Sequence, residues 1–352
     1  MCRTPWLLLL LPPTAAPAQF GDFMYRLLNG DSTRGPGYDT AYVTSYRDDL
    51  CISLVTAYQG SSIDIDRTDG ATLTYSTNTP MQYGASIDYK WLGVEATFTV
   101  PGLSQLDPDL GATEARGLGF GFTGRRWWFR NFILASEGFY PEEPRQVDPD
   151  WQEGRPYPFR PDLENLTYMA GIHRGFNGRK FSYTAARTQT ERQKRSAGSW
   201  TAGATFWFSR TRGSSGLLPV FDLANYSTAA NVRSVRRWLF CLTGGYAHTF
   251  ALWHHGFVHL MVVPGLGAQQ QALQLADREE RSTGWTFAAS TEFRMGLGWN
   301  ADRWYAAMSL VAYESAGAVS EDVDLSTSIV NLHLATGWRF RHIKPLWRQL
   351  GL

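Results

Sequence analysis

The sequence of 352 residues lacks the features of several common protein classes. It has no apolar run of the roughly 18 residues that a membrane-spanning helix needs. Its 33 basic residues nearly balance 32 acidic ones, so it lacks the basic excess of a nucleic-acid-binding protein. Its three cysteines are too few for a disulfide framework. These shortages exclude a helical membrane protein, a nucleic-acid partner and a disulfide-rich domain.

What the sequence has instead is aromatic residues, glycine and a period of two. Aromatic residues make up 14% of the chain, and glycine occurs 34 times. From Leu50 onward, segments such as "LCISLVTAY", "GLGFGFTG" and "SWTAGATFWF" alternate apolar residues with polar or small ones. This period indicates strands with one apolar face, and no helical period competes with it. The combination is typical of a membrane β-barrel.

The stretch "MQYGASIDYKWLGVEATFTV", residues 81–100, is predicted to be a β-hairpin. Apolar residues occupy alternate positions, and the alternation changes parity near Trp91. A connection there places Tyr89 opposite Val94, so that both strands share one apolar face. The position of that face, in a protein core or in lipid, decides the class of the protein.

The connections between predicted strands fall into two sizes. The short ones are Trp91/Leu92, Thr123–Arg126, Phe176–Arg179, Leu252–Gly256 and Asn300–Arg303. The long ones are Pro101–Ala115, Pro141–Asp162, Gln270–Ser282 and Ala316–Asp324. Tight periplasmic turns alternating with larger outside loops are typical of outer-membrane barrels. We therefore predict an all-β fold, a transmembrane antiparallel up-and-down β-barrel of outer-membrane type.

The strand count is predicted to be twelve to fourteen. Thirteen strand-like segments can be marked, whereas closure of a bacterial barrel requires an even number. A strand hidden near Leu217–Leu223, inside the segment Arg210–Ser234, would give about fourteen. A segment split or merged elsewhere would give twelve. The same segment could instead plug the lumen.

The chain divides into four predicted regions. Residues 1–18 form a secretory signal peptide, with a short apolar core and a small-x-small triplet before the cleavage site. Residues 19–49 form a periplasmic lead-in, residues 50–341 the barrel, and residues 342–352 a periplasmic tail. Cys51 and Cys241 are expected to be free thiols, with a single bridge between them as the alternative.

The face opposite the apolar rows carries small residues and both signs of charge, which suits a polar lumen. The lumen-facing candidates are Asp88, Lys90, Glu95, Glu292, Arg294, Asn331, His333 and Arg339. Tryptophans near the segment ends suit the aromatic girdles of a membrane barrel. The alternative is a soluble β-sandwich or lipocalin-like barrel with the apolar rows turned inward. That alternative explains the alternation equally well, but it does not explain the signal peptide, the strand count and the sorting of the loops together.

The densest polar cluster, "RTQTERQKRSAGS" at residues 187–199, provides an anion-binding hypothesis. Placed at a barrel rim, Arg192, Lys194 and Arg195 would bind an anionic group such as a lipopolysaccharide phosphate. The alternative is a solvated loop whose charges compensate one another.

No catalytic constellation stands out. His333 shares its face with Asn331, and Ser290 and Ser309 lie in neighbouring predicted strands, but no spacing singles out a nucleophile, a base and an orienting group. The paired histidines His254 and His255 are too few for a zinc site. We therefore expect no enzyme activity, no metal and no cofactor.

Four stretches together resemble a known family. They are "DTAYVTSYRDDLCISL", "STNTPMQYGASIDYKWLGVEATF", "FNGRKFSYTAARTQTERQKRSAGSW" and "GLGWNADRWYAAMSLV", spread over about Asp39 to Phe340. In this order they resemble a family of bacterial outer-membrane β-barrel proteins, common in the Bacteroidota, that is catalogued as domain of unknown function four-four-two-one. The resemblance implies the fold and the location. It brings no catalytic or binding residues.

The sequence therefore predicts an integral protein of the bacterial outer membrane, exported by its signal peptide. Its activity is open between a small-solute pore and a structural or partner-binding anchor, with a barrel-embedded lipid hydrolase as the remaining alternative. Expected partners are outer-membrane lipid and lipopolysaccharide, a periplasmic or surface protein, and the barrel-insertion machinery. That machinery would read the last strand, "HLATGWRF".

Overall fold

The computed structural model of the protein describes residues 37–66, 71–89, 92–219, 232–275, 281–282, 284–320 and 323–341. The predicted signal peptide, the predicted tail and Lys90 lie outside these residues.

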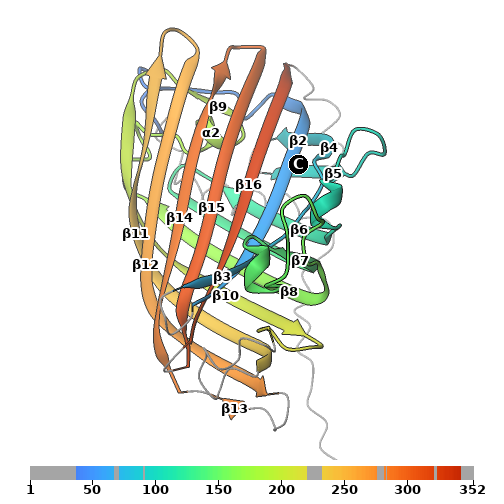
Figure 1. Ribbon diagram of the computed structural model, residues 1–352. Helices are drawn as coiled ribbons and strands as arrows, with labels where there is room; N and C mark the ends of the chain where they lie inside the picture. Colours follow the sequence, from blue (N-terminus) through green and yellow to red (C-terminus); the bar gives the residue numbers. More distant parts are fainter. Residues whose placement is uncertain are drawn as a thin grey trace, which may run out of the picture.

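Strands dominate the described chain (Figure 1). They are β1 (Val43–Ser45), β2 (Leu50–Asp66), β3 (Thr72–Ser76), β4 (Gln82–Tyr89), β5 (Leu92–Phe98), β6 (Glu114–Thr123), β7 (Trp127–Pro141), β8 (Arg160–Gly175), β9 (Glu191–Gln193), β10 (Ala197–Gly213), β11 (Val232–Leu252), β12 (Gly256–Leu275), β13 (Arg281–Ser282), β14 (Thr286–Asn300), β15 (Trp304–Ser320) and β16 (Val323–Phe340). The helices are η1 (Pro108–Leu110), η2 (Pro144–Gln146) and α2 (Thr184–Arg187). No helix in the described part of the chain is long and apolar enough to cross a membrane.

Ten strands form a closed antiparallel ring, in the order β2-β16-β15-β14-β12-β11-β10-β8-β7-β3 and back to β2. The contact between β16 and β2 is an unbroken ladder, with Phe340 opposite Leu50. The contact between β3 and β7 is much shorter, with Tyr75 opposite Pro141 and Ser76 opposite Tyr140. The predicted all-β antiparallel barrel is therefore confirmed.

The ring has fewer strands than the predicted twelve to fourteen for two reasons. First, β3 and β4 are two pieces of one passage of the chain, because both pair with β2. Second, β5 pairs only with β4 and β6 only with β7, so neither belongs to the closed ring. β10 and β11 pair directly as antiparallel neighbours, so the ring closes without a strand between them. Residues 220–231, where the hidden strand was partly predicted, lie outside the described residues.

The predicted hairpin at residues 81–100 is β4 and β5, with a register that differs from the prediction by two residues. Tyr89 lies opposite Leu92, and Ile87 lies opposite Val94. The two-residue connection between Tyr89 and Leu92 is the shortest common hairpin loop. Because the shift is even, every side chain keeps its predicted face.

The apolar rows point outward. Large apolar side chains along the strands are between 61% and 78% exposed: Leu54, Leu118, Trp200, Leu242, Leu266 and Phe287. Exposed apolar surface on this scale marks contact with lipid rather than water. In the hairpin of β4 and β5, the face that contains Ile87 therefore points toward lipid, whereas Asp88 on the opposite face is buried inside the barrel.

The two ends of the barrel differ. Short connections, residues 124–126, 253–255 and 301–303, gather at the end where β2 begins and β16 ends, which we name the short-turn end. Trp304 and Trp338 face each other across β15 and β16 near this end. Longer connections join β7 to β8, β10 to β11, and β12 to β14 at the opposite end. The predicted long loop Ala316–Asp324 is mostly strand, because Ala316 pairs with Ser326.

The interior of the barrel is filled at both ends. At the long-loop end, a buried apolar cluster closes the interior; it contains Ile63, Ile65, Leu73, Tyr75, Phe139, Leu163, Leu217, Leu218, Val232, Val235, Leu273 and Leu325. At the short-turn end, residues 176–196 fold inward as α2 and β9, and β9 pairs with β1 (Figure 1). We name residues 176–196 together with β1 the plug.

Candidate functional site: a cavity behind a seam in the barrel wall

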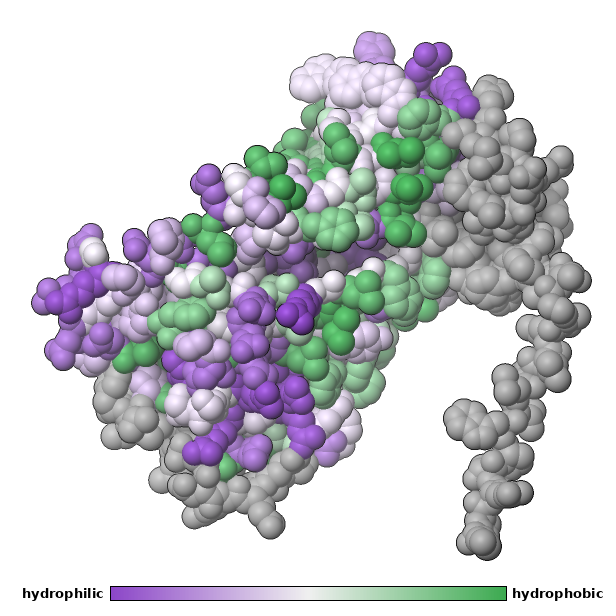
Figure 2. Space-filling model, turned by 90° about the vertical axis from the view of Figure 1, so that its right-hand side faces the viewer, coloured by the Kyte–Doolittle hydropathy of each residue, from purple (hydrophilic) through white to green (hydrophobic). Residues whose placement is uncertain are grey.

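The wall of the barrel is interrupted between β5 and β6. Within the described residues no ladder joins these two strands, although they are neighbours along the wall. We name this interruption the seam. Figure 2 views the corresponding side of the molecule and shows a hollow crossing it, with hydrophilic residues in its depth and hydrophobic patches beside it.

A cavity of about 930 Å³ lies behind the seam. Its lining comes from both edges of the seam, from the facing wall formed by β14, β15 and β16, and from the inner end of the plug. Inward-facing residues make up much of the lining, and the edges of the seam also contribute outward-facing residues such as Phe98 and Leu118. The polar lining includes Gln59, Gln82, Asp88, Glu95, Arg187, Ser309, Asn331 and His333. We name this space the seam cavity.

A hydrogen-bonded pair of side chains lies in the seam cavity. His333 Nε2 lies 2.9 Å from Glu95 Oε2, and these side chains are 28% and 42% exposed. His333 comes from β16 and Glu95 from β5, and β2 and β4 lie between these two strands in the sheet. Two polar groups that remain partly accessible in this way can bind the polar part of a ligand.

The edges of the seam have glycine residues on their inner side and large apolar residues on their outer side. Gly119 and Gly121 of β6 line the cavity. A side chain at Gly121 would meet the backbone oxygen of Phe129 at 2.7 Å, so this strand lies too close to β7 for anything larger. On the outer face, Leu118 is 71% exposed and Phe98 is 67% exposed. A path from the lipid-facing surface to the cavity thus passes from apolar to polar groups.

A buried charge network forms the inner wall of the cavity. Glu292 makes ion pairs with Arg130 and Arg294, and the Arg294 contact measures 3.5 Å. Arg130 Nη1 also donates to Tyr313 Oη at 2.9 Å. Because burial makes an unpaired charge costly, this network holds β7, β14 and β15 in a fixed arrangement across the interior.

Comparisons with known proteins identify the family. The chain matches the family described as "Domain of unknown function (DUF4421)" over residues 37–340. The chain belongs to this family. No curated protein shows a significant match to the sequence.

Solved structures similar to this DUF4421 protein are outer-membrane barrels with very low sequence identity. The outer-membrane protease OmpT of Escherichia coli has a TM-score of 0.41 at 5% identity, over 84% of this chain and 98% of its own. The toluene transporter TodX of Pseudomonas putida has a TM-score of 0.25 at 9% identity, over 83% and 89% of the two chains. The attachment protein Ail of Yersinia pestis has a TM-score of 0.19 at 12% identity, over 84% and 99%.

The plug of this DUF4421 protein is held by a second buried charge network. The Glu191 side chain is fully buried and makes ion pairs with Arg125 and with Arg47, the latter at 2.8 Å. Ser182 Oγ donates to the other carboxylate oxygen of Glu191 at 2.6 Å. Arg47 precedes the barrel and Arg125 lies in a turn, so Glu191 ties three separate segments together.

A third contact holds the plug at the barrel end. Tyr46 Oη donates to Asp302 Oδ1 at 2.6 Å, and Arg192 Nη1 donates to the same oxygen at 2.8 Å. The hydrogen bond from Tyr46, together with the charge of Arg192, holds the pKa of Asp302 below its ordinary value. Asp302 therefore remains a carboxylate, and it holds Arg192 of the plug and Tyr46, the residue that follows β1.

The structure places the predicted lumen residues in two groups. Asp88, Glu95, Arg294, Asn331 and His333 line the seam cavity, and Glu292 lies in the network beside it. Arg339 lies at the plug instead, where it donates to the Gln189 and Ala301 carbonyl oxygens and to Asn300 Oδ1.

The three residues of the predicted anion-binding rim lie in different environments. Arg192 is already bound to Asp302, whereas Lys194 and Arg195 are exposed beside it. The cluster also lies at the short-turn end, because residues 176–196 fold into the barrel rather than forming a surface loop. The buried Glu191 at its centre neutralises arginines of other segments, not a ligand.

Sequence reasoning missed the plug and the seam. The plug consists of one helical turn and a three-residue strand, both too short to produce a periodic pattern. One signal could have indicated it. The connection between β8 and β10 is longer than a short turn, and it contains the polar residues Ser182, Thr184 and Glu191, which are buried in the structure. The seam gave no signal, since β5 and β6 alternate like paired strands.

Two further observations concern metal ligands and cysteines. No cluster of three or more His, Cys, Asp or Glu side chains that could hold a metal ion occurs there. Cys51 and Cys241 are both buried free thiols, so the alternative of a single bridge is wrong.

Proposed function

We propose that this protein is an outer-membrane barrel that takes a single-chain amphiphile from the bilayer sideways through the seam into the seam cavity. The observation that carries the proposal is the missing ladder between β5 and β6 in front of a polar cavity. Unpaired backbone N–H and C=O groups in lipid are costly, each by about several kcal/mol. The missing ladder therefore costs free energy, and we infer that it is retained because a ligand binds or passes there.

The chemistry of the cavity defines the ligand class. The apolar outer edges, such as Phe98 and Leu118, would contact a hydrocarbon chain that stays in the bilayer. The partly exposed pair of Glu95 and His333 offers one acceptor and one donor group to a polar or zwitterionic head. A lysophospholipid has both parts, so it is a suitable probe.

An axial small-solute pore has less support. The apolar cluster at the long-loop end and the plug at the short-turn end both lie across the barrel axis. The seam cavity is the large space that opens between them, and it opens to the side. We therefore expect the protein to give no stepwise ion conductance in planar bilayers.

The proposal is tested by blocking the cavity from inside. The barrel would be placed in nanodiscs and titrated with lysophosphatidylethanolamine, and occupancy would be read by native mass spectrometry. Thr97→Trp fills the inner edge of the seam, since Thr97 lines the cavity and donates to Gln82. Leu242→Trp introduces the same side chain at a lipid-facing position of β11 that does not line the cavity, and it is the control. We expect wild-type protein and the control to bind one molecule and Thr97→Trp to bind none; equal occupancy in all three would reject the proposal.

The outer-membrane location is tested separately. A closed membrane barrel extracted from outer-membrane fractions should migrate faster on a denaturing gel when unboiled than when boiled. A periplasmic, detergent-independent protein without this shift would contradict the location.

One observation favours a second candidate, a lipid hydrolase. Ser309 lies directly opposite His333 in the β15–β16 ladder, and His333 contacts Glu95, so a hydroxyl, an imidazole and a carboxylate line one cavity. In the described structure, however, no hydrogen bond joins Ser309 to His333. We therefore infer binding rather than catalysis. Release of fatty acid from phospholipid that is abolished in Ser309→Ala would reverse this choice.

A further inference from the structure

The charged side chains that line the seam cavity fall into three groups. Arg130 and Arg294 are held by the buried Glu292 of the inner wall. Arg116 and Glu114 pair with each other at 3.5 Å and are largely exposed. The third group, which we name the cavity cluster, consists of Asp88, Glu95, Arg187 and His333.

Arg187 brings a guanidinium from the plug into the seam cavity. It is the last residue of α2, and its side chain lines the cavity. Its Nη1 donates to Thr123 Oγ1 at 3.2 Å, which holds the arginine beside the end of β6. Within the described chain Arg187 forms no ion pair, so most of its N–H groups are available to a ligand.

Two carboxylates of the cavity cluster belong to the other edge of the seam. In the β4–β5 ladder, Asp88 lies opposite Gly93 and Ser86 lies opposite Glu95, so both carboxylates are on the inward face. A Cβ atom at Gly93 would meet Asp88 Oδ1 at 2.5 Å, so this carboxylate extends over β5 into space that only glycine leaves open. Glu95 is the diagonal neighbour of Asp88, at a separation that long side chains can bridge.

The cavity cluster places both signs of charge around one space. Asp88 is close enough to Arg187, Glu95 and His333 for the charge of each to act on it. Glu95 hydrogen-bonds to His333 at 2.9 Å, whereas neither carboxylate forms an ion pair with Arg187 in the described structure. A guanidinium and two carboxylates therefore face the same cavity without contact between them.

This arrangement complements a head group that carries both signs of charge. A guanidinium matches phosphate oxygens in bidentate geometry. Carboxylates accept hydrogen bonds from a primary ammonium, whereas a quaternary ammonium has no N–H to donate and is held by aromatic faces. A phosphoethanolamine head has both required parts, a phosphate and a primary ammonium, joined by a short linker.

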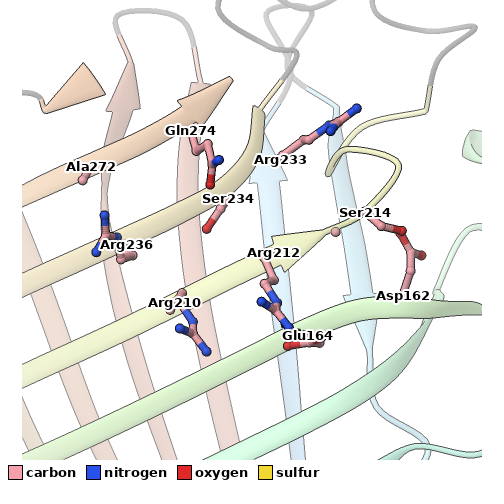
Figure 3. Close-up of a pocket in the computed structure, with 11 residues that line it drawn as sticks. Asp162, Glu164, Arg210, Arg212, Ser214, Arg233, Ser234, Arg236, Ala272 and Gln274 are labelled. Atoms are coloured by element: carbon pink, nitrogen blue, oxygen red, sulfur yellow. Dashed lines mark hydrogen bonds and ion pairs between the residues drawn. The ribbon is translucent and has the colours of Figure 1, made fainter. Parts of the chain in front are cut away.

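A shallower cavity of about 380 Å³ at the long-loop end provides a contrast (Figure 3). Its lining includes the carboxylates of Asp162 and Glu164. Arg212 binds Glu164 through two contacts of 2.7 and 2.8 Å, and Ser214 Oγ donates to Asp162 at 3.0 Å. Both carboxylates are therefore already bound by neighbouring side chains, unlike Asp88 and Glu95 beside Arg187.

We propose that the seam cavity is specific for a single-chain lipid with a phosphoethanolamine head, whose phosphate binds Arg187 and whose ammonium binds Asp88 and Glu95. This inference rests on the proposed function, because it names the head group of the same ligand. A head bound in this way connects the end of β6 at Thr123 to the inward face of β5, so it bridges the seam from inside. Because Arg187 belongs to α2, the ligand also contacts the plug.

The test uses the full-length barrel in phosphatidylcholine nanodiscs with three probes of equal chain length: lysophosphatidylethanolamine, lysophosphatidylcholine and a monoacylglycerol. One variant is Arg187→Gln, and the other is Asp88→Asn with Glu95→Gln. Both variants remove charge and nearly keep side-chain size. The matched control is Arg174→Gln, an exposed arginine of β8 that lies 5.6 Å from the Trp127 ring. Titrations followed by native mass spectrometry give the affinities.

Wild-type protein and the control should bind lysophosphatidylethanolamine at least about tenfold more tightly than lysophosphatidylcholine, because only a primary ammonium donates hydrogen bonds to the carboxylates. Arg187→Gln should weaken both phospholipids by at least about tenfold and leave the monoacylglycerol unchanged. The carboxylate variant should bind the two phospholipids equally. Equal affinity for the two phospholipids in wild-type protein would overturn the proposal, as would unchanged binding of lysophosphatidylethanolamine in either variant.

Arg187→Lys separates a contact with phosphate from a structural role in the plug. It keeps the positive charge, so it should recover part of the phospholipid affinity that Arg187→Gln loses. A loss as large as in Arg187→Gln would show that the residue acts through the structure of the plug, and would overturn its assignment to phosphate.

The three probes also distinguish this inference from the proposed function. Equal binding of all three probes by wild-type protein would keep a lateral site for amphiphiles and reject only the head-group specificity. Binding of none of them by wild-type protein would reject the lateral site itself, and the head-group assignment with it.

Discussion

Glu191 shows how single interior residues hold this barrel together. Its carboxylate is fully buried between two arginines that come from different parts of the chain. A buried ion pair adds little net stability compared with an apolar core, but removing one partner leaves the other charge uncompensated. The ion pairs of Glu191 therefore fix the position of the plug and add little to the net stability of the barrel.

We predict that Glu191→Ala lowers the free energy of unfolding by about 3–5 kcal/mol, because Arg47 and Arg125 would remain buried without their shared carboxylate. Glu114→Ala is the matched control, since Glu114 is 75% exposed and its pair with Arg116 at 3.5 Å lies on the surface. The control should change stability by less than about 1 kcal/mol. Urea titration in detergent micelles, followed by tryptophan fluorescence, measures both values. Similar losses in the two variants would show that Glu191 does not hold the plug.

At the scale of the elements, the seam makes β5 and β6 different from every strand of the ring. Each is hydrogen-bonded on one side, to β4 and β7 respectively, whereas β11 is paired along both sides with β10 and β12. The two strands are also short, seven and ten residues against 21 for β11. Fewer cooperative hydrogen bonds mean lower local stability.

We predict that amides of β5 and β6 exchange with deuterium faster than those of β11, by on the order of tenfold or more. The reason is that the loss of roughly one hydrogen bond per amide lowers the local opening free energy by about 1 kcal/mol or more. Hydrogen–deuterium exchange of the barrel in nanodiscs, read by mass spectrometry, measures the difference. Addition of lysophosphatidylethanolamine should slow exchange in β5 and β6 alone. Equal protection of all three strands would mean that the seam closes in the membrane.

The elements also show where sequence reasoning succeeds and where it stops. Period-two alternation identified the inward face of β16 correctly, with His333 and Arg339 inside, because strand geometry is local. It could not tell that Glu95 reaches His333, since these residues lie 238 positions apart and meet only when the ring closes. Likewise, the alternation of β5 and β6 contains no information on whether their edges pair.

The same limit applies to the plug. "RTQTERQKRSAGS" was interpreted as a rim cluster because charged residues usually lie on the surface. In the folded chain the cluster is divided: Glu191 is buried, Arg192 binds Asp302, and Lys194 is exposed. Which charges a segment buries depends on partners such as Arg47 and Arg125, and no local pattern records those partners.

At the scale of the whole molecule, the exposed apolar belt is the feature that separates a membrane barrel from a soluble one. Leu242 is at the centre of β11 and is 78% exposed, with Ala204 and Leu266 as its cross-strand neighbours. In water, such a position would tolerate a charged residue. In lipid it would not, and the penalty would depend on depth.

We predict that Leu242→Arg destabilises the barrel by about 2–4 kcal/mol in lipid vesicles, because it places a guanidinium near the bilayer midplane. Leu252→Arg, at the end of β11 and also lipid-facing, should cost only about 0–1 kcal/mol, because an arginine there reaches the interface. Reversible unfolding by guanidinium chloride in vesicles compares the two variants with wild-type protein. The difference between them, rather than either value alone, reports membrane depth, since both substitutions change size and charge equally. Equal and small effects at the two positions would mean that the belt contacts water and not lipid, and would contradict a membrane barrel.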